Sequence, residues 1–226
     1  MENFVITIAR GFGSGGKALG LRLADELGIS CYENKILSLA SEITGKETAE
    51  LIEIDEKLKK GIIHSLLRKS KGGREPKAST KKFESEEDIF KCQSDIIRHL
   101  AKTESCIIVG KCADYVLKDF DNVISIYIEA PRAYCLKRIM SRMKVDEKEA
   151  AKLIETTDKY RAEYYEYYTM GNYWTNPVNY DLTLNMDRVG EDMAIDIIKH
   201  YIKAKFGEVI LKQSETSPGL YTFATK

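Results

Sequence analysis

The stretch Arg10-Gly11-Phe12-Gly13-Ser14-Gly15-Gly16-Lys17 decides how the rest of the chain is interpreted. It follows Phe4 to Ala9 (FVITIA), an apolar and β-branched run typical of a strand buried on both faces of a parallel sheet. Leu19, Leu23 and Leu27 then recur at helical spacing, so the order is strand, glycine loop, helix. In such a unit, loop N–H groups and the helix N-terminus bind an anion, and a lysine adds a full positive charge.

This loop matches two motifs. The dinucleotide-binding pattern G-x-G-x-x-G is met by Gly11, Gly13 and Gly16. Its acidic residue, expected roughly 20 positions on, would be Glu33. The P-loop pattern G-x-x-x-x-G-K-[ST] is met except at its last position, where Ala18 stands. Lys17 suits a β/γ-phosphate, and the segment before Glu33 is short for a central strand. A mononucleotide site is therefore favoured, with a dinucleotide site or a simple glycine-rich turn as the alternatives.

The composition predicts a single domain with a full core, because the chain has 226 residues, of which 43% are hydrophobic. Lys+Arg and Asp+Glu both number 35, so no excess of positive charge predicts a nucleic-acid partner. No apolar run reaches the ~20 residues of a membrane span. The five cysteines are scattered, without C-x-x-C spacing, and the three histidines lie far apart, so neither disulfides nor a metal site is predicted. We expect a cytoplasmic protein without a membrane partner; its oligomeric state stays open.

Strands and helices alternate along the rest of the chain. Ser105 to Val109 and Asn122 to Glu129 are predicted strands, and Asn179 to Asn185 is a last short one. This alternation predicts the α/β class with a doubly wound parallel sheet. Lys111 follows the first of these strands, at the carboxyl end where open α/β sheets bind ligands.

Two segments concentrate charge. Residues 68–82 contain seven basic residues and one acidic residue, which predicts a surface loop: either a clamp over an anionic substrate or a solvated insertion. Arg138 and Arg142 are four residues apart and share one helical face, where they either lie in solvent or bind an anion. Tyrosines recur along the helix that follows, a pattern more typical of packing than of base stacking.

With these segments in place, the chain resembles the cytidylate kinase-like family of P-loop nucleoside monophosphate kinases over roughly positions 4 to 206. The stretches that carry the resemblance are TIARGFGSGGKALGLRLADELGI, IIRHLAKTESCIIVGKCADYVL, RIMSRMKVDEKEA, and TTDKYRAEYYEYYT followed by NYDLTLN. It implies a five-stranded parallel core within one P-loop kinase domain over 1–226. It further implies a helical monophosphate-binding insertion over 34–104 and a lid over 144–175, and leaves the tail 207–226 without a role.

The resemblance also implies ATP-dependent phosphorylation of a nucleoside monophosphate, expected to be CMP or dCMP, with ATP as co-substrate and Mg²⁺ as cofactor. The implied ATP-binding residues are Gly11, Gly13, Ser14, Gly15, Gly16, Lys17, Ala18, Arg138 and Arg142. The implied catalytic residues are Lys17, Arg142 and Arg161, since a planar guanidinium can hold two oxygens of the transferring group. The implied acceptor-binding residues are Lys111, Asp158 and Lys159, and no protein ligand of a metal is expected.

Three positions depart from the family pattern. Ala18 lacks the hydroxyl that many P-loop proteins place on Mg²⁺, Glu33 stands where the family carries aspartate, and Lys111 stands where it carries arginine. Lysine keeps the charge but loses the two-pronged geometry of arginine. Two other functions therefore stay open: a P-loop kinase of another small acceptor, and a nucleotide-binding regulatory module with weak catalysis.

Overall fold

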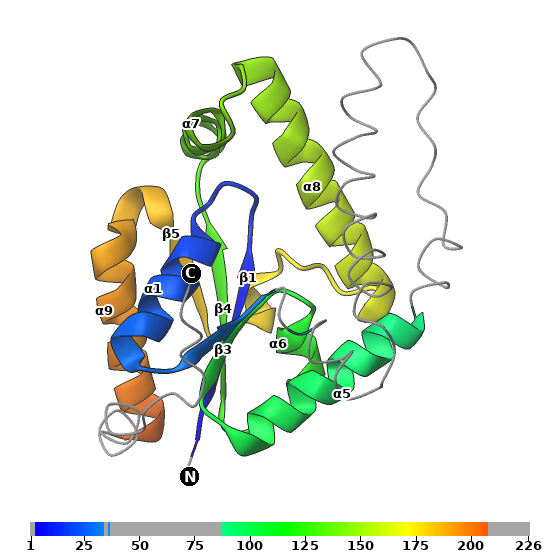
Figure 1. Cartoon of the computed structure of the whole chain (residues 1–226), viewed down its shortest axis with the longest axis vertical. Helices are drawn as coiled ribbons and strands as arrows, with labels where there is room; N and C mark the ends of the chain where they lie inside the picture. Colours follow the sequence, from blue (N-terminus) through cyan, green and yellow to red (C-terminus); the bar gives the residue numbers. More distant parts are fainter. Residues whose placement is uncertain (1–2, 34–35, 37–86, 208–226) are drawn as a thin grey trace, which may run out of the picture.

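A computed structural model describes residues 3–33, 36 and 87–207 of the chain. Its centre is a parallel sheet with the strand order β2-β3-β1-β4-β5 (Figure 1). The strands are β1 (Val5–Arg10), β2 (Ser30–Tyr32), β3 (Cys106–Val109), β4 (Val123–Glu129) and β5 (Leu182–Asn185). The predicted α/β class and the five-stranded, doubly wound parallel sheet are confirmed.

The helices follow the predicted alternation. They are α1 (Gly16–Leu27), α5 (Glu87–Thr103), α6 (Ala113–Val116), α7 (Arg132–Met143), α8 (Glu147–Tyr168), the 3₁₀ helix η1 (Pro177–Asn179) and α9 (Met186–Phe206). The last helix begins directly after β5. There the Asn185 side chain accepts a hydrogen bond from the Asp187 N–H, and a break at Gly190 (φ 69°, ψ 176°) separates this first turn from the rest.

Two apolar cores lie on opposite faces of the sheet. Alternate residues of β1 contribute to the two cores: Ile6 and Ile8 pack with α1 and α9, whereas Val5 packs with α5 and α6. Figure 1 shows α1 and α9 on the left of the sheet and α5 and α6 on the right. Because each fully buried isoleucine contributes roughly 1.5–3 kcal/mol, strands of this kind fix the sheet in place.

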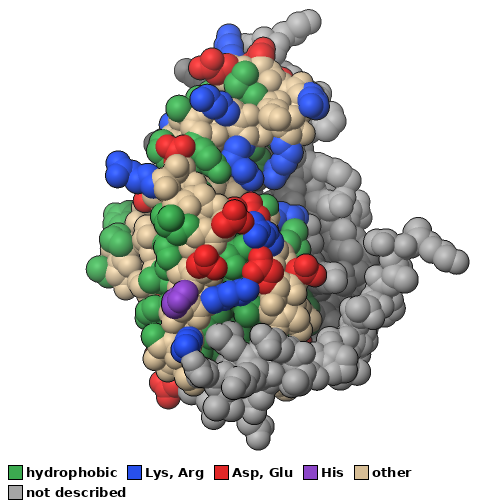
Figure 2. Space-filling model, turned by 90° about the vertical axis from the view of Figure 1, so that its left-hand side faces the viewer, with side chains coloured by type: hydrophobic (Ala, Val, Ile, Leu, Met, Phe, Trp, Pro, Cys, Tyr) green, Lys and Arg blue, Asp and Glu red, His purple; other side chains and the backbone are tan. Residues whose placement is uncertain are grey.

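The outer face of α1 and α9 carries mixed charge. Arg22 pairs with Asp192 at 2.6 Å, and Lys199 pairs with Glu26 at 2.6 Å, so the ion pairs join the two helices. Figure 2 looks onto this face and shows acidic and basic side chains interleaved over it. Exposed pairs of this kind contribute roughly 0–1 kcal/mol each. None of the helices in the described part of the chain is long and apolar enough to cross a membrane.

The topology brings the candidate site together at one edge of the sheet. β1 pairs with β3 in parallel, with Ile8 opposite Val109. The glycine loop that follows β1 and the Gly110-Lys111 pair that follows β3 therefore leave the sheet side by side. Several predicted segments lie outside the described residues. They are the basic loop 68–82, the tail from 208 onward, and the predicted insertion 34–104, of which only Ile36 and residues 87–104 are described.

Candidate active site

The glycine loop is held by hydrogen bonds within itself and to strand β4. The Gly11 N–H donates to the Ile128 carbonyl at 3.1 Å, and the Ser14 N–H and hydroxyl both donate to the Gly11 carbonyl, at 3.3 and 2.9 Å. Gly13 and Gly15 have φ values of +90° and +100°, a region that glycine enters without strain. The loop leads directly into α1, as the motif predicts.

A cavity of about 1050 Å³ lies beside this loop. It is walled by the loop, α7, α8, α5 and the residues after β3, and exceeds the ~300–1000 Å³ usual for one small ligand. Its lining cations are Arg10, Lys17, Lys111, Lys137, Arg138, Arg142 and Arg161, whereas its lining carboxylates are Glu33 and Asp114. The excess of positive charge suits an anionic ligand.

Most of the predicted site residues line this cavity. They are Gly11, Gly13, Gly15, Gly16, Lys17, Ala18, Lys111, Arg138, Arg142 and Arg161. Three others are placed differently. Ser14 is fully buried and serves the loop through its bond to Gly11, Asp158 bonds to the loop from outside the lining, and Lys159 is exposed on α8. The structure thus brings the two arginines of α7 to the glycine loop but does not bring Lys159 to it.

Lys17 and Arg10 share one carboxylate. Glu33 pairs with the Lys17 Nζ through Oε2 and with the Arg10 Nη2 through Oε1, the latter at 3.2 Å. Arg10 lies against the backbone of Gly110, where an added Cβ would be 2.1 Å from the Arg10 Nη1. Burial lowers the pKa of Arg10, with Glu33 opposing that effect. Sequence reasoning gave Arg10 no role, although a basic residue ending a buried strand was the available signal.

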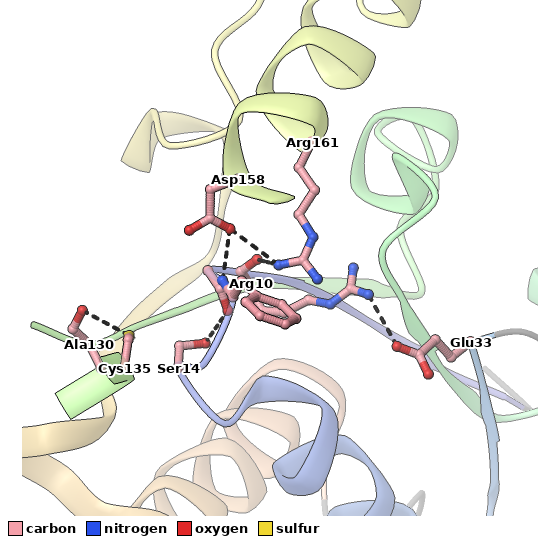
Figure 3. Close-up of polar contacts among 9 residues, drawn as sticks. Arg10, Ser14, Glu33, Ala130, Cys135, Asp158 and Arg161 are labelled. Carbon is pink, nitrogen blue, oxygen red and sulfur yellow. Dashed lines mark hydrogen bonds and ion pairs between the residues drawn. The ribbon is translucent and has the colours of Figure 1, made fainter. Parts of the chain in front are cut away.

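Two charged residues of α8 hold the glycine loop, and we call Asp158 and Arg161 the α8 clasp (Figure 3). The Asp158 Oδ1 accepts a hydrogen bond from the Phe12 N–H at 2.8 Å. The Arg161 Nη1 donates to the Arg10 carbonyl at 2.9 Å and lies 3.4 Å from the Asp158 Oδ1. Burial and the neighbouring Arg10 lower the pKa of Arg161 to about 9, and burial raises the pKa of Asp158.

Phe12 connects the loop to α7 and α8, of which α8 lies within the predicted lid 144–175. Its ring packs with apolar residues of α7 and α8, among them Ile139 and Leu153. The guanidinium carbons of Arg142 and Arg161 lie 6.0 and 5.6 Å from the centre of the same ring. Cation–π contacts of this kind contribute about 0.5–1 kcal/mol at exposed sites. Phe12 stands at a variable position of the motif, so the glycine pattern alone could not indicate this role.

The cavity lining also includes buried polar groups that sequence reasoning missed. Gln93 on α5 and Asp114 on α6 both line the cavity and are both buried. The Tyr165 hydroxyl, from α8, donates to the Asp114 Oδ2 at 2.6 Å. Burial raises the pKa of Asp114 to about 6, although that hydrogen bond opposes the rise.

The donor set does not form a metal cage. Within the described ranges, no cluster of three or more His, Cys, Asp or Glu side chains could hold a metal ion. Ala18 offers no hydroxyl, and the hydroxyl of Ser14 is directed at the Gly11 carbonyl. A magnesium ion at this site would therefore be held through phosphate oxygens and water, as is common for this ion, with Glu33 as the carboxylate beside Lys17.

Comparison with known proteins agrees with this geometry. The sequence profile of the cytidylate kinase-like family matches residues 5–188. An uncharacterized protein from Eubacterium ventriosum ATCC 27560 is 28% identical, with a TM-score of 0.66, covering 89% of this chain and 99% of that chain. TT1252 from Thermus thermophilus is 12% identical, with a TM-score of 0.53 and coverage of 91% and 99%, a likeness of fold alone. No curated protein matches the sequence.

Proposed function

Because this chain belongs to the cytidylate kinase-like family, we propose that it transfers the γ-phosphoryl group of ATP to a nucleoside monophosphate, with CMP or dCMP as the acceptor. The observation that carries the proposal is the arrangement of charge around one cavity. Lys17 lies at the glycine loop, Lys111 follows the neighbouring strand, and arginines of α7 and α8 lie along the same cavity. The products would be ADP and the nucleoside diphosphate.

The donor end of the cavity is the glycine loop. Its N–H groups and the N-terminus of α1 would receive the phosphates of ATP, with Lys17 as the mobile cation. Binding there would draw Lys17 from Glu33, which keeps Arg10 as a partner. Arg138 lies close to the loop, since a Cβ at Gly15 would be 3.5 Å from its Nη2, and it would contact ATP from the α7 side.

The transferring group would meet the arginines on either side of Phe12. Both described hydrogen bonds of Arg161 use Nη1, and a guanidinium has five N–H donors, so a phosphate oxygen can be bound without breaking the clasp. Arg142 would approach the same group from α7. These cations stabilise charge that spreads over the phosphoryl oxygens in the transition state.

The acceptor needs no general base, because a monophosphate dianion is already a competent nucleophile. Lys111 would hold the acceptor phosphate as a point charge beside the loop. Mg²⁺, when bound with ATP, would offset the negative charge of the phosphates. With small nucleotides as its ligands, we place the activity in the cytoplasm and expect neither a nucleic-acid nor a membrane partner.

A panel of acceptors tests the proposal. ATP and Mg²⁺ are incubated with each nucleoside monophosphate and, separately, with small hydroxylated metabolites, and ADP release is measured. We expect release with CMP or dCMP above the background without acceptor. Release only with a metabolite would make the chain a P-loop kinase of another acceptor. Tight ATP binding without release in any mixture would point to a regulatory module.

A further inference from the structure

Gln93 is a buried polar side chain whose carbonyl oxygen is left without a partner. The side chain is 3% exposed and lies on the wall of the cavity. Among the described residues, nothing donates a hydrogen bond to its Oε1. Leaving a buried acceptor unpaired costs about 1–3 kcal/mol, and most buried polar groups avoid this. A ligand in the cavity that brings an N–H donor would remove this cost.

Asp114 presents a second acceptor on the same wall. Asp114 is 8% exposed, and its Oδ2 accepts a hydrogen bond from the Tyr165 hydroxyl. Helices α5 and α6 pack together through one apolar cluster, which includes Ile97 and Ala113, so both acceptors are held on a rigid support. The cavity lining thus carries oxygen acceptors from α5 and α6 in addition to the cations of the loop, α7 and α8.

The cavity also contains aromatic side chains that suit a flat ring. Tyr160, Tyr164 and Trp174 line the same cavity, and aromatic side chains offer flat surfaces on which a base can stack. Lys111 lines the same cavity and stands three residues before Asp114 in the chain. A nucleotide whose phosphate is at Lys111 can therefore place its base toward α5 and α6.

We propose that Gln93 and Asp114 bind an exocyclic amine on the base of the acceptor, which favours a cytosine, adenine or guanine nucleotide as the acceptor and disfavours uracil and thymine nucleotides. The proposal rests on the proposed function and adds the chemistry of base selection to it. An amine donates two hydrogens, one for each acceptor oxygen. Uracil has a carbonyl oxygen where cytosine has its amine. This oxygen would face the acceptor oxygens of Gln93 and Asp114, and it could be bound only if the Gln93 amide rotated to present its NH₂ group.

Binding of CMP and UMP is the direct test, because the two bases have nearly the same shape. Isothermal titration with the wild type, Gln93→Leu and a control, Ser94→Ala, gives both affinities without requiring turnover. Ser94 is equally buried on α5 but donates to the Phe90 carbonyl at 2.8 Å and is not part of the cavity lining. We expect the wild type to prefer CMP by about tenfold or more, as expected where a site hydrogen-bonds a substrate group.

In Gln93→Leu, CMP affinity should fall by about tenfold and UMP affinity by less than about threefold, which reduces the preference for CMP over UMP. Ser94→Ala should keep the wild-type preference for CMP. The melting temperature of free Gln93→Leu should stay the same or rise, because an unpaired buried acceptor has been removed. Three results would overturn this inference alone. The wild type could bind CMP and UMP with equal affinity, or Gln93→Leu could keep the wild-type preference for CMP. Gln93→Leu could also melt at a lower temperature and lose affinity for CMP and UMP equally. If the wild type binds no monophosphate at all, the proposed function fails, and this inference with it.

Discussion

The α8 clasp should position the glycine loop for ATP, and Asp158→Ala tests this. The substitution removes the acceptor of the Phe12 N–H bond at 2.8 Å and the weaker contact with Arg161 at 3.4 Å. A hydrogen bond to a charged group contributes about 1.5–3 kcal/mol, and a side chain that is 28% exposed warrants a value near the lower end. We expect the free energy of unfolding to fall by about 1–2 kcal/mol, which lowers the melting temperature by roughly 2–8 °C.

The loss of loop geometry should appear in ATP use as well. If about 1.4 kcal/mol of the lost interaction is expressed in nucleotide binding, the KM for ATP rises roughly tenfold. ADP release at varied ATP measures this, and binding of a fluorescent ATP analogue gives a second reading that does not depend on the acceptor.

Asp146→Ala is a matched control on the same helix. Its Oδ1 also accepts a backbone N–H at 2.8 Å, from Glu149, but it caps the start of α8 instead of holding the loop. Loss of such a cap costs about 0.5–2 kcal/mol, so the two variants should lose similar stability. Only Asp158→Ala should change ATP binding. Equal ATP affinities in the two variants would refute the role given to the clasp.

Three further predictions concern single cavity residues. Lys17→Ala should lower kcat at least about a hundredfold and leave the circular dichroism spectrum unchanged, because one oriented charge is removed from a half-exposed position; unchanged turnover would exclude the P-loop assignment. Lys111→Ala should raise the acceptor KM and lower kcat with the ATP KM unchanged, and Lys111→Arg should keep acceptor use; initial-rate kinetics with both substrates decide between this and a merely solvated lysine. Asp114→Asn tests the raised pKa: burial moves the pKa of Asp114 from 3.8 to about 6, so the folded wild type binds the extra proton between those values and loses stability as pH rises through them. Between pH 4 and pH 7, the free energy of unfolding of the variant, measured with denaturant, should rise by up to about 3 kcal/mol relative to that of the wild type. Parallel pH profiles of the two unfolding free energies would contradict the prediction.

The fold was predictable because its signals are local. A buried β-branched run, a glycine loop and leucines at helical spacing each specify their own element, and the carboxyl-end rule then places Lys111 beside the loop. The start of α9 was not predictable to the residue, because the Asn185 cap and the break at Gly190 form one extra turn that an apolar periodicity does not register.

The roles of Asp158 and Lys159 could not be separated from the sequence. Neighbouring residues on a helix point about 100° apart, so only one of them can face a given partner. Which one does so depends on how α8 crosses the loop, and that crossing is set by packing of α7, α8 and Phe12. Asp158 meets the Phe12 N–H, whereas Lys159 is exposed. A charge pattern can thus indicate a phosphate-binding helix without indicating which of its charges reaches the site.

Gln93 shows a different limit of the same kind. It stands three residues after Phe90 and four before Ile97, on the apolar stripe by which α5 packs against its neighbours. A glutamine at such a position is a signal, because a buried amide needs partners. The sequence cannot tell whether that part of the stripe is covered by protein, in which case the partner is structural, or borders a cavity, in which case the partner is a ligand. The structure places Gln93 on the cavity wall with its Oε1 unpaired among the described residues, and this is why the amide is better explained by what the cavity binds than by how the helix packs.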